Sequence, residues 1–371
     1  MKANSPRVEA LLPSDGRWMA LLGRCIHDFY HLPGYAETCA KPIDGAEAIA
    51  FDVQEGERHL FLPMILRPLP DFGDPRLQGW RDASSPYGYP GPLLVTGDGE
   101  PGHRASFAAE AVRALLQHMQ QLRILTAFVR FHPLLDTPLE AFSTSGEVLL
   151  HGRTVSIDLQ LPEEQIWRDT RRNHRTQITQ LKEAGAEAIV DPDWRHLDAF
   201  LAAYQATMDR VRAQQSYYFE RSYYEGLRRA LGERAHLFVL KLRDRTAAAA
   251  IITEVCGIVQ FHLAATFSEF VSQHPQKLLF HEVCRWAKHR GNRVLHLGGG
   301  LGGKEDELYH FKAGFSPLRH PFHTWRARCE PGVYDRALAL WQERARPASV
   351  DPSFFPPYRQ LQASRADQVG C

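Results

Sequence analysis

A lysine follows an aromatic residue in the segment YHFKAGFSP, which contains Phe311 and Lys312. A lysine ammonium can stabilise the negative charge that develops on a carbonyl oxygen during acyl transfer. Phe311 and Phe315 are four residues apart, the spacing of a packed pair on a helix, and a lysine beside such a pair is commonly solvated. The spacing by itself leaves a catalytic and a purely structural interpretation of Lys312 open.

The glycine run LGGGLGGK precedes this lysine. Gly298, Gly300 and Gly303 fit the pattern GxGxxG, but the run comes late and no acidic residue follows at the distance that a dinucleotide site needs. Glu305 stands where a Walker loop has the Ser or Thr that binds magnesium. A nucleotide-binding fold is therefore not expected, and the glycines supply backbone N–H groups to an anion or form a tight turn.

A second cluster lies in YQATMDRVRAQQSYYF. Thr207 and Arg210 fall on helical spacing, and Tyr217 follows in a break of the pattern. An arginine fork on such a helix can bind phosphate or carboxylate. The alternative is an amphipathic helix that ends in aromatic packing.

Basic residues gather in one further segment, at spacings i, i+3, i+4, i+7 and i+14. They are Arg168, Arg171, Arg172, Arg175 and Lys182. This spacing predicts one basic face of a single helix, which could contact a nucleic-acid backbone. A solvated helix face is the alternative interpretation.

Metal and serine-hydrolase chemistry are not expected. His27 and His31 stand four residues apart among 18 histidines, but no HExxH motif or third ligand accompanies them. The chain has no GxSxG motif for a nucleophilic serine.

Hydrophobic periodicity predicts an α+β fold with two halves. In the first, residues 49–53, 58–66 and 125–131 are expected strands and residues 107–119 an expected helix. The pattern restarts near residue 150 with a strand, helices, a three-strand meander over 237–264, a helix over 275–289, and a strand, a short helix and a strand up to residue 328. This order is similar to that of the GNAT N-acyltransferase fold. The tail, with one helix from Pro331 and the segment FFPPYR, is expected to pack on the first half.

Length and charge bound the possible functions. A chain of 371 residues predicts about two domains. Its 44 basic and 43 acidic residues give a net charge of +1, which excludes a surface that coats nucleic acid or anionic membrane by bulk charge. The six cysteines have no CxxC spacing, and no segment has the apolar length of a signal peptide or membrane span, so a cytoplasmic location is expected.

Several segments, taken in order along most of the chain, resemble the Fem-type peptidyl transferases of the GNAT superfamily. They are DASSPYGYPGP, RFHPLL, TMDR with the following YYF, FHLAAT, HLGGG and YHFKAGFSP. The resemblance implies two tandem GNAT-like domains. The first would span residues 1–150 and be completed by about 329–371, and the second would span residues 151–328 and carry the Phe-Lys motif.

The resemblance also implies an aminoacyltransferase that moves an amino acid from aminoacyl-tRNA to the amine of a small-molecule or peptide acceptor, such as a cell-wall or natural-product precursor. No cofactor beyond the tRNA co-substrate is implied. Lys312 is expected at the reaction centre. Expected substrate contacts are Tyr87 of the SPYGY loop, Thr207, Arg210, Tyr217, His262 and Phe311. His262, Glu254 and Glu305 are candidate bases by their position.

The chain lacks the long helical hairpin that some Fem-type members carry for tRNA, so Arg168, Arg171, Arg172 and Arg175 are the candidate tRNA contacts. One alternative is an N-acyltransferase that uses acyl-CoA. The glycine-rich phosphate loop of such enzymes is replaced here by SQHPQKLL, in which Gln276 and Lys277 could still meet a phosphate. The other alternative is a catalytically silent binding module.

Overall fold

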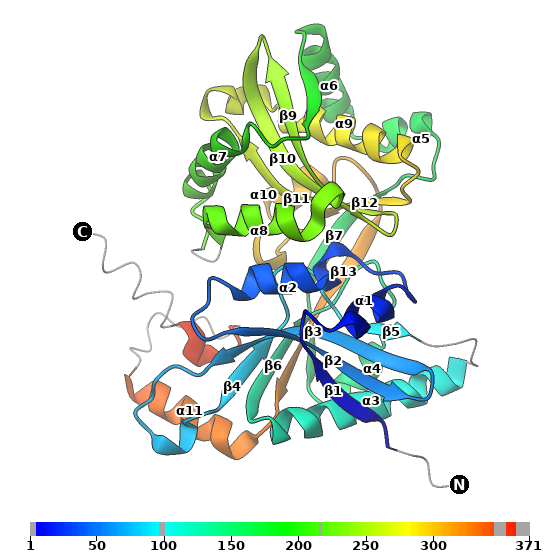
Figure 1. Ribbon diagram of the computed structural model, residues 1–371. Coiled ribbons are helices and arrows are strands. Elements are labelled where there is room, and N and C mark those ends of the chain that lie inside the picture. Colours follow the sequence, from blue (N-terminus) through cyan, green and yellow to red (C-terminus); the bar gives the residue numbers. More distant parts are fainter. Residues whose placement is uncertain (1–4, 96–100, 215–216, 345–353, 361–371) are drawn as a thin grey trace. The chain divides into compact units, whose positions relative to one another are not determined.

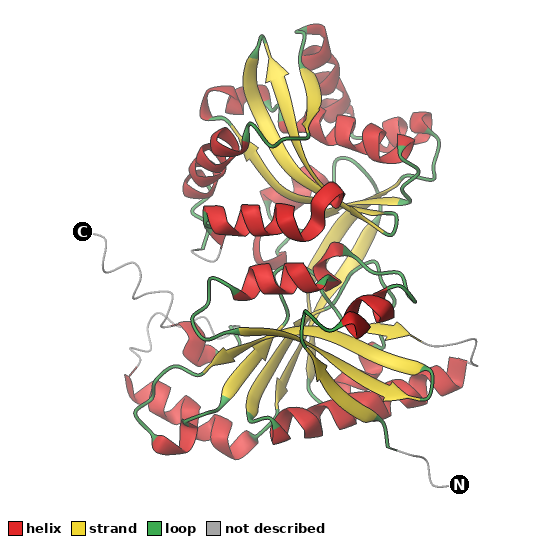
Figure 2. Cartoon of the chain, in the orientation of Figure 1, coloured by secondary structure: helices red, strands yellow, loops and turns green. Residues whose placement is uncertain are grey.

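The computed structural model describes residues 5–95, 101–214, 217–344 and 354–360. The chain divides into two compact units, unit 1 from Met1–Leu150 with His323–Cys371 and unit 2 from His151–Phe322. Each unit is a sheet flanked by helices, and the predicted α+β fold class is confirmed (Figures 1 and 2). The strands β7 (Glu147–Asp158) and β13 (Arg319–Arg328) carry the chain from one unit to the other.

The sheet of unit 1 has the strand order β1-β2-β3-β4-β6-β13, with β5 paired to β3. Its pairs are antiparallel except for β4 and β6, which are parallel. The remaining bounds are β1 Arg7–Leu11, β2 Glu47–Glu55, β3 Arg58–Pro68, β4 Arg81–Ser84, β5 Leu93–Val95 and β6 Ile124–Arg130. A parallel pair needs a crossover, and helix α3 (Pro101–Gln121) lies within it.

Helix α3 covers one face of this sheet (Figure 1). Its buried residues Phe107, Ala111, Leu115 and Met119 recur at helical spacing and pack in one core with alternate residues of β3, such as Leu62. Burying a large apolar side chain contributes about 1.5–3 kcal/mol. The sequence pattern therefore predicted this helix. The other helices of this region are α1 (Gly16–Leu22), α2 (Pro33–Ala40) and α4 (Leu139–Ser143).

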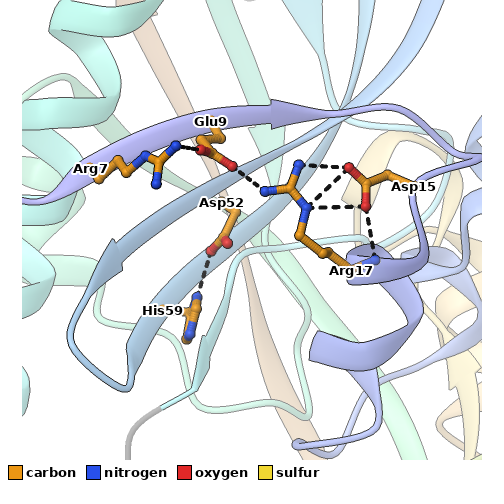
Figure 3. A network of polar contacts seen from close by, with 6 residues as sticks. All are labelled: Arg7, Glu9, Asp15, Arg17, Asp52 and His59. Atoms are coloured by element: carbon orange, nitrogen blue, oxygen red, sulfur yellow. Dashed lines mark hydrogen bonds and ion pairs between the residues drawn. The ribbon is translucent and has the colours of Figure 1, made fainter.

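The first strand and helix escaped prediction because charged side chains obscure their periodicity. Figure 3 shows the network: Glu9 on β1 pairs with Arg7 and with Arg17 on α1. Arg17 also binds Asp15 at 2.7 Å, and the Asp15 carboxylate accepts the Arg17 backbone N–H as the N-cap of α1. These contacts between near neighbours in sequence fix a short strand and a short helix that hydrophobic spacing does not indicate.

The C-terminal segment packs on the sheet of unit 1 through one buried carboxylate. Helix α11 (Pro331–Arg344) and the short helix η8 (Pro357–Arg359) contribute to a core with residues of β6 and its surroundings. Asp82 is fully buried and accepts hydrogen bonds from Thr126 at 2.6 Å and from the Tyr358 hydroxyl at 2.7 Å. Arg359, 8% exposed, pairs with its second oxygen at 2.7 Å.

Unit 2 repeats the strand pattern of unit 1. Its order is β8-β9-β10-β11-β12-β7, antiparallel except for the pair β11 and β12. The bounds are β8 Glu187–Asp191, β9 Ala235–Leu242, β10 Arg245–Val255, β11 Ile258–Thr266 and β12 Val294–Gly298. In both units a three-strand antiparallel meander is followed by a crossover helix and a parallel strand. The predicted meander is thus present, whereas β8 was missed.

Helices cover both faces of this second sheet. Helices α6 (Arg172–Glu183) and α9 (Gln276–His289) share a core with one face. Helices α7 (Leu197–Arg210) and α8 (Arg221–Leu231) contact β11 and β9, respectively. The short helix α10 (Glu307–Lys312) follows β12.

The predicted single helix with one basic face is wrong. The segment forms α5 (Glu163–Asp169) and α6, separated at Thr170, whose ψ of 128° is extended. The Thr170 hydroxyl donates to the Ile166 carbonyl, and Arg175 Nη1 donates to the carbonyls of Arg168 and Thr170 at 2.8 and 2.6 Å. These donors satisfy carbonyls that the end of a helix leaves without partners. The basic residues therefore lie on two helices and the junction between them.

In the described ranges, no helix is long and apolar enough to cross a membrane. The five cysteines within these ranges, Cys25, Cys39, Cys256, Cys284 and Cys329, form no disulfide, and Cys371 lies outside the described residues.

Substitution Asp82→Asn should destabilise unit 1, because it leaves Arg359 buried without its counter-charge. Loss of one partner of a buried ion pair costs about 3–5 kcal/mol. The matched control is Asp136→Asn, which breaks a pair with Arg104 in which Asp136 is 74% exposed and which should cost less than about 1 kcal/mol. Chemical denaturation of both variants measures the difference. Equal stabilities would contradict the role of Asp82.

Candidate active site

The candidate site begins where two parallel strands stop pairing. Strands β11 and β12 pair only from Ile258 to Gln260, after which β11 continues to Thr266. Gln260 and His296 form the last pair, and their side chains are joined by a buried 2.7 Å hydrogen bond. Ligands in open α/β sheets bind beyond the carboxyl ends of the strands, where main-chain groups are left for other partners. The residues beyond this pair are therefore the first to consider.

His262 is the extra residue of a β-bulge. Leu263 pairs with Ile251 and Phe261 with Ile252, so His262 has no opposite residue on β10. A bulge of this kind redirects a side chain and is common beside active sites. The His262 Nε2 lies 2.8 Å from the Tyr223 hydroxyl of α8, and burial lowers the pKa of His262 to about 3. His262 is therefore a neutral hydrogen-bonding group at physiological pH.

Helix α7 ends against the carboxyl end of β11. Thr207 Oγ1 donates to the Ala203 carbonyl at 2.7 Å and accepts the Thr266 backbone N–H at 3.4 Å. Arg210 is exposed, and its Nη2 donates to Thr207 Oγ1 at 3.1 Å. Tyr217 follows the last residue of α7 by seven positions, and residues 215–216 of the connecting segment lie outside the described ranges. The structure thus brings Thr207 and Arg210 together at the end of β11.

Lys312 lies at the carboxyl end of the neighbouring strand. It is the last residue of α10, and its Nζ donates to the Gly299 carbonyl at 2.7 Å, one residue beyond β12. Burial lowers the pKa of Lys312 from 10.5 to about 8, and nearby Asp306 acts in the opposite direction. Lys312 is half-buried. Such an ammonium is cationic below about pH 8 and loses its charge above it.

The glycine run is a close-packed turn that Asp306 holds in place. A Cβ on Gly300 would lie 2.1 Å from the Lys304 carbonyl oxygen and 2.2 Å from an Asp306 carboxylate oxygen, so only glycine fits there. The Asp306 carboxylate accepts the backbone N–H groups of Leu301 and Tyr309, at 2.8 and 2.9 Å. One side chain therefore fixes the glycine turn and caps α10, which carries Lys312. Sequence reasoning missed Asp306, although an acid before a helical segment is an N-cap signal.

Phe311 belongs to an aromatic cluster that supports α10. Its ring packs 5.4 Å from Phe280 and 5.5 Å from Phe315. His174 of α6 lies under the turn after α10, with its Nε2 3.0 Å from the Phe311 carbonyl oxygen. A Cβ on Gly314 would lie 2.4 Å from that nitrogen. His174 is a second supporting residue that the sequence did not reveal, because it is distant from Phe311 along the chain.

The two acidic base candidates are held by arginines. Glu254 contacts Arg290 Nε at 2.9 and 3.0 Å, and hydrogen bonds from Arg290 and Asn292 lower its pKa although burial opposes them. Glu305 pairs with Arg153 at 2.8 Å, which lowers the pKa of Glu305. Both carboxylates are therefore ionised and engaged at physiological pH.

The segment at the start of α9, with Gln276 and Lys277, could have formed a phosphate-binding turn, yet its environment differs from a glycine-rich loop. His274 has the left-handed φ of 52° that glycine usually supplies. Lys277 is buried with its ammonium on Gln177, and burial lowers its pKa. The Gln276 side-chain amide donates to the Ala265 carbonyl at 2.7 Å. Both side chains are therefore engaged in hydrogen bonds within the fold.

Tyr87 lies in unit 1, on a loop that buried side chains hold. Its carbonyl accepts the Tyr35 hydroxyl at 2.8 Å. The next residue, Gly88, has a φ of +97°, and a Cβ there would lie 2.1 Å from the Tyr30 ring. His31, one of the two histidines weighed as zinc ligands, lies 3.0 Å from the Gly91 carbonyl oxygen through its Nε2. The SPYGY loop is thus a fixed element, and the substrate role of Tyr87 stays a prediction.

Among the described residues, no group of three or more His, Cys, Asp or Glu side chains could hold a metal ion. Of the candidate tRNA contacts, Arg168, Arg171 and Arg172 are exposed, whereas Arg175 is bound to carbonyls at the end of α5.

Residues 168–313 match the family model of the acetyltransferase (GNAT) domain. This stretch is similar to GNAT acetyltransferase domains. The matched stretch ends one residue after Lys312 and includes the parallel pair β11 and β12, the glycine turn and α10. The match supports a transferase of the GNAT type.

The chain is similar in fold to the crystal structure of FemX, with a TM-score of 0.64 and 14% identity over 88% of this chain and 99% of that one. A conserved protein of unknown function from Bacteroides thetaiotaomicron is similar with a TM-score of 0.52 and 10% identity, over 86% and 99% of the two chains. A tandem GNAT protein from the clavulanic acid biosynthesis pathway has a TM-score of 0.47 and 13% identity, over 88% and 99%. No curated protein matches by sequence. The first two similarities show a shared fold, as the Fem-type resemblance implied.

Lys312 should titrate near pH 8, about two units below an ordinary lysine, because burial disfavours its charged form. Reductive ¹³C-methylation followed by NMR would measure the pKa of each lysine. A titration from about pH 6 to about pH 11 covers both the expected value for Lys312 and that of an ordinary lysine. The signal that disappears in Lys312→Ala identifies the residue. A titration above about pH 10 would contradict this placement.

Substitution Asp306→Asn should lower the pKa of Lys312 further, because the carboxylate favours the ammonium form. The control is Glu307→Gln, which removes an exposed carboxylate from the next position on α10. The same NMR titration compares the two variants. Equal shifts in both would show that Asp306 has no special effect on Lys312.

Proposed function

We propose that the protein is an aminoacyltransferase that moves an amino acid from aminoacyl-tRNA to the amine of a small-molecule or peptide acceptor. The observation that carries the proposal is the placement of Lys312 in the GNAT domain, with its ammonium at the carboxyl end of β12. The similarity of the whole fold to FemX supports a Fem-type arrangement. The identities of the amino acid and acceptor are left to experiment.

The reaction forms one amide bond and breaks one ester bond. The acceptor amine attacks the ester carbonyl, and a tetrahedral intermediate with a negative oxygen forms and then expels the ribose hydroxyl of the tRNA. An ester is already activated, so positioning and stabilisation of this oxygen matter more than a covalent enzyme nucleophile. In the proposal Lys312 supplies the positive charge. Its partial burial strengthens the attraction between the ammonium and the negative oxygen, because little water screens the two charges.

The acceptor side is assigned to the end of β11. Arg210 offers an exposed guanidinium beside Thr207, suited to a phosphate or carboxylate of the acceptor. Tyr217 and Tyr87 are proposed as further acceptor contacts. His262 and Phe311 are proposed to line the site, with His262 accepting or donating a hydrogen bond as a neutral ring. No group is assigned as the base, and the departing ribose oxygen can take up the amine proton.

We favour an aminoacyl-tRNA donor over acyl-CoA because of the residues at the start of α9. A CoA diphosphate would need open backbone N–H groups at that helix start. Here Pro275 precedes the helix, Lys277 is buried against Gln177, and Gln276 is bound to the Ala265 carbonyl. The exposed Arg168, Arg171 and Arg172 are the proposed tRNA contacts, and Arg175 is omitted because its guanidinium is used within the fold.

The decisive assay offers the purified protein mixed charged tRNAs or an acyl-CoA pool, each with a panel of amines, and follows new amide products by mass. Lys312→Ala should reduce the rate by about 10²–10³-fold, because it removes the charge that stabilises the intermediate. Lys304→Ala, an exposed lysine of the glycine turn, is the matched control and should stay within about two-fold. Unchanged turnover in Lys312→Ala would exclude the proposed role.

The pH dependence of the transfer rate tests whether the positive charge at position 312 is what the reaction needs. Wild-type activity should fall above about pH 8 as Lys312 loses its proton, whereas Lys312→Arg keeps its charge and should show no such fall. Amide formed only from acyl-CoA would overturn the tRNA donor. No amide from either donor would favour a silent binding module.

A further inference from the structure

A cavity of about 410 Å³ lies in unit 2 among the helices α5, α6 and α9. None of the residues that line it belongs to the candidate active site around Lys312. Small-molecule sites in proteins have volumes of about 300–1,000 Å³, so this cavity has room for an organic ligand of moderate size.

The lining of the cavity combines buried apolar side chains with two aromatic rings. Ile166, Ile178 and Cys284 are buried beneath it. The half-buried indole of Trp167 lies beside the His281 ring, with 5.1 Å between the ring centres and 59° between the planes. Because the two rings are too close to admit a third between them, a flat ligand would stack on the part of the indole that faces the cavity.

Several polar groups of the lining are not used by the fold. The Trp167 indole N–H, the His281 ring nitrogens and the Thr179 hydroxyl form no hydrogen bond with any residue in the described ranges, and the Glu282 carboxylate is 3.9 Å from His281 Nε2. Burial lowers the pKa of His281 to about 4, and the Lys182 charge acts in the same direction. The neutral ring therefore offers one N–H donor and one acceptor nitrogen.

The charged groups of the lining are occupied. Lys182 pairs with Glu282 at 2.7 Å, and Arg285 lies 3.6 Å from Glu163. The Lys288 ammonium donates to two main-chain carbonyls, at 2.8 and 2.7 Å. A ligand group inside the cavity should therefore be uncharged, with donors and acceptors of its own.

Guanidiniums without a counter-charge follow Trp167 along the chain. Arg171 and Arg172 are exposed, and their side chains form no ion pair or hydrogen bond within the part of the chain that the structure describes. Arg168 is exposed as well and donates to the uncharged Gln165 amide at 2.8 Å. An anionic group attached to the ligand would find its counter-charge here.

We propose that this cavity binds a nucleobase, and that Arg168, Arg171 and Arg172 bind the phosphate attached to it. A base is flat and uncharged, and its edge carries donors and acceptors, so it suits an aromatic surface beside unused polar groups. Proteins bind unstacked bases on aromatic side chains and the backbone between them on basic groups. Glu164, exposed at the cavity, can accept the amino group of a base.

The base can come from an RNA strand or from a free nucleotide. Only the choice of RNA rests on the proposed function, since a tRNA donor would bring single-stranded nucleotides to the protein. The cavity and the arginines are properties of the fold, whatever reaction the protein catalyses.

The test measures binding alone, by isothermal titration calorimetry at low salt. The probes are a single-stranded RNA of about six nucleotides, an abasic strand of the same length, and the four nucleoside monophosphates. The wild type should bind the RNA at least about ten-fold more tightly than the abasic strand, because only the RNA has bases to stack. Trp167→Leu should lose this preference. The matched control Trp80→Leu, which replaces a half-buried tryptophan of unit 1, should keep it.

Two further variants separate stacking from charge. The double substitution Arg171→Gln and Arg172→Gln should weaken binding of the RNA and of the abasic strand by the same factor, and should reduce the salt dependence of both. Thr179→Met extends a side chain at an exposed position of the lining and should reduce the preference for the RNA. It tests the cavity if Trp167→Leu does not fold.

Three results would overturn the proposal: no binding of the RNA or the monophosphates, equal binding of the RNA and the abasic strand, or an unchanged preference in both Trp167→Leu and Thr179→Met. Monophosphates that bind as tightly as the RNA would assign the cavity to a free nucleotide, and tighter binding of the RNA would assign it to a strand. No charged tRNA takes part, so a protein that binds the base but forms no amide would lose the proposed function and keep this site.

Discussion

The candidate site depends on the early end of pairing between β11 and β12. Three residue pairs hold these parallel strands together, and the hydrogen bond between Gln260 and His296 closes the last pair. Beyond it, the chain after β12 must satisfy its main-chain groups elsewhere. Asp306 accepts the Leu301 N–H of the glycine turn, and Lys312 donates to the Gly299 carbonyl. The position of the Lys312 ammonium is therefore a consequence of strand geometry.

This dependence links stability to chemistry. Asp306 caps α10 and fixes the turn, while its charge raises the pKa of Lys312 against the effect of burial. His174 and the aromatic residues around Phe311 hold the other side of the same short helix. A helix of six residues is too short to be stable by itself, so its orientation comes from these contacts.

The two units share one strand pattern, but different charged groups lie near the parallel strand pair of each. In unit 2, the parallel pair leads to a single lysine with a carboxylate nearby. In unit 1, the sheet face around the parallel pair β4 and β6 carries Asp82, whose acceptors are all used by Thr126, Tyr358 and Arg359. The Nε of Arg67 is buried beside them without a hydrogen-bond partner.

The amino-acid sequence by itself determined the elements whose periodicity is strong. The helix through Phe107 and Met119, the meander over 237–264 and the restart near residue 150 follow from apolar spacing, because burial of one face imposes that spacing. It also singled out Lys312, Thr207 and Arg210 as residues of interest. Short elements with charged residues, such as β1 and β8, gave too little pattern to detect.

Only the tertiary structure decided the features that arise between distant residues. The bulge at His262 depends on its pairing with β10, and the break at Thr170 depends on donors that end one helix and start another. The charge state of Lys312 depends on burial, and the lack of a hydrogen-bond partner for Arg67 Nε depends on which acceptors are already used. Local sequence cannot encode them, because hydrogen-bond partners and desolvation are properties of the folded surroundings.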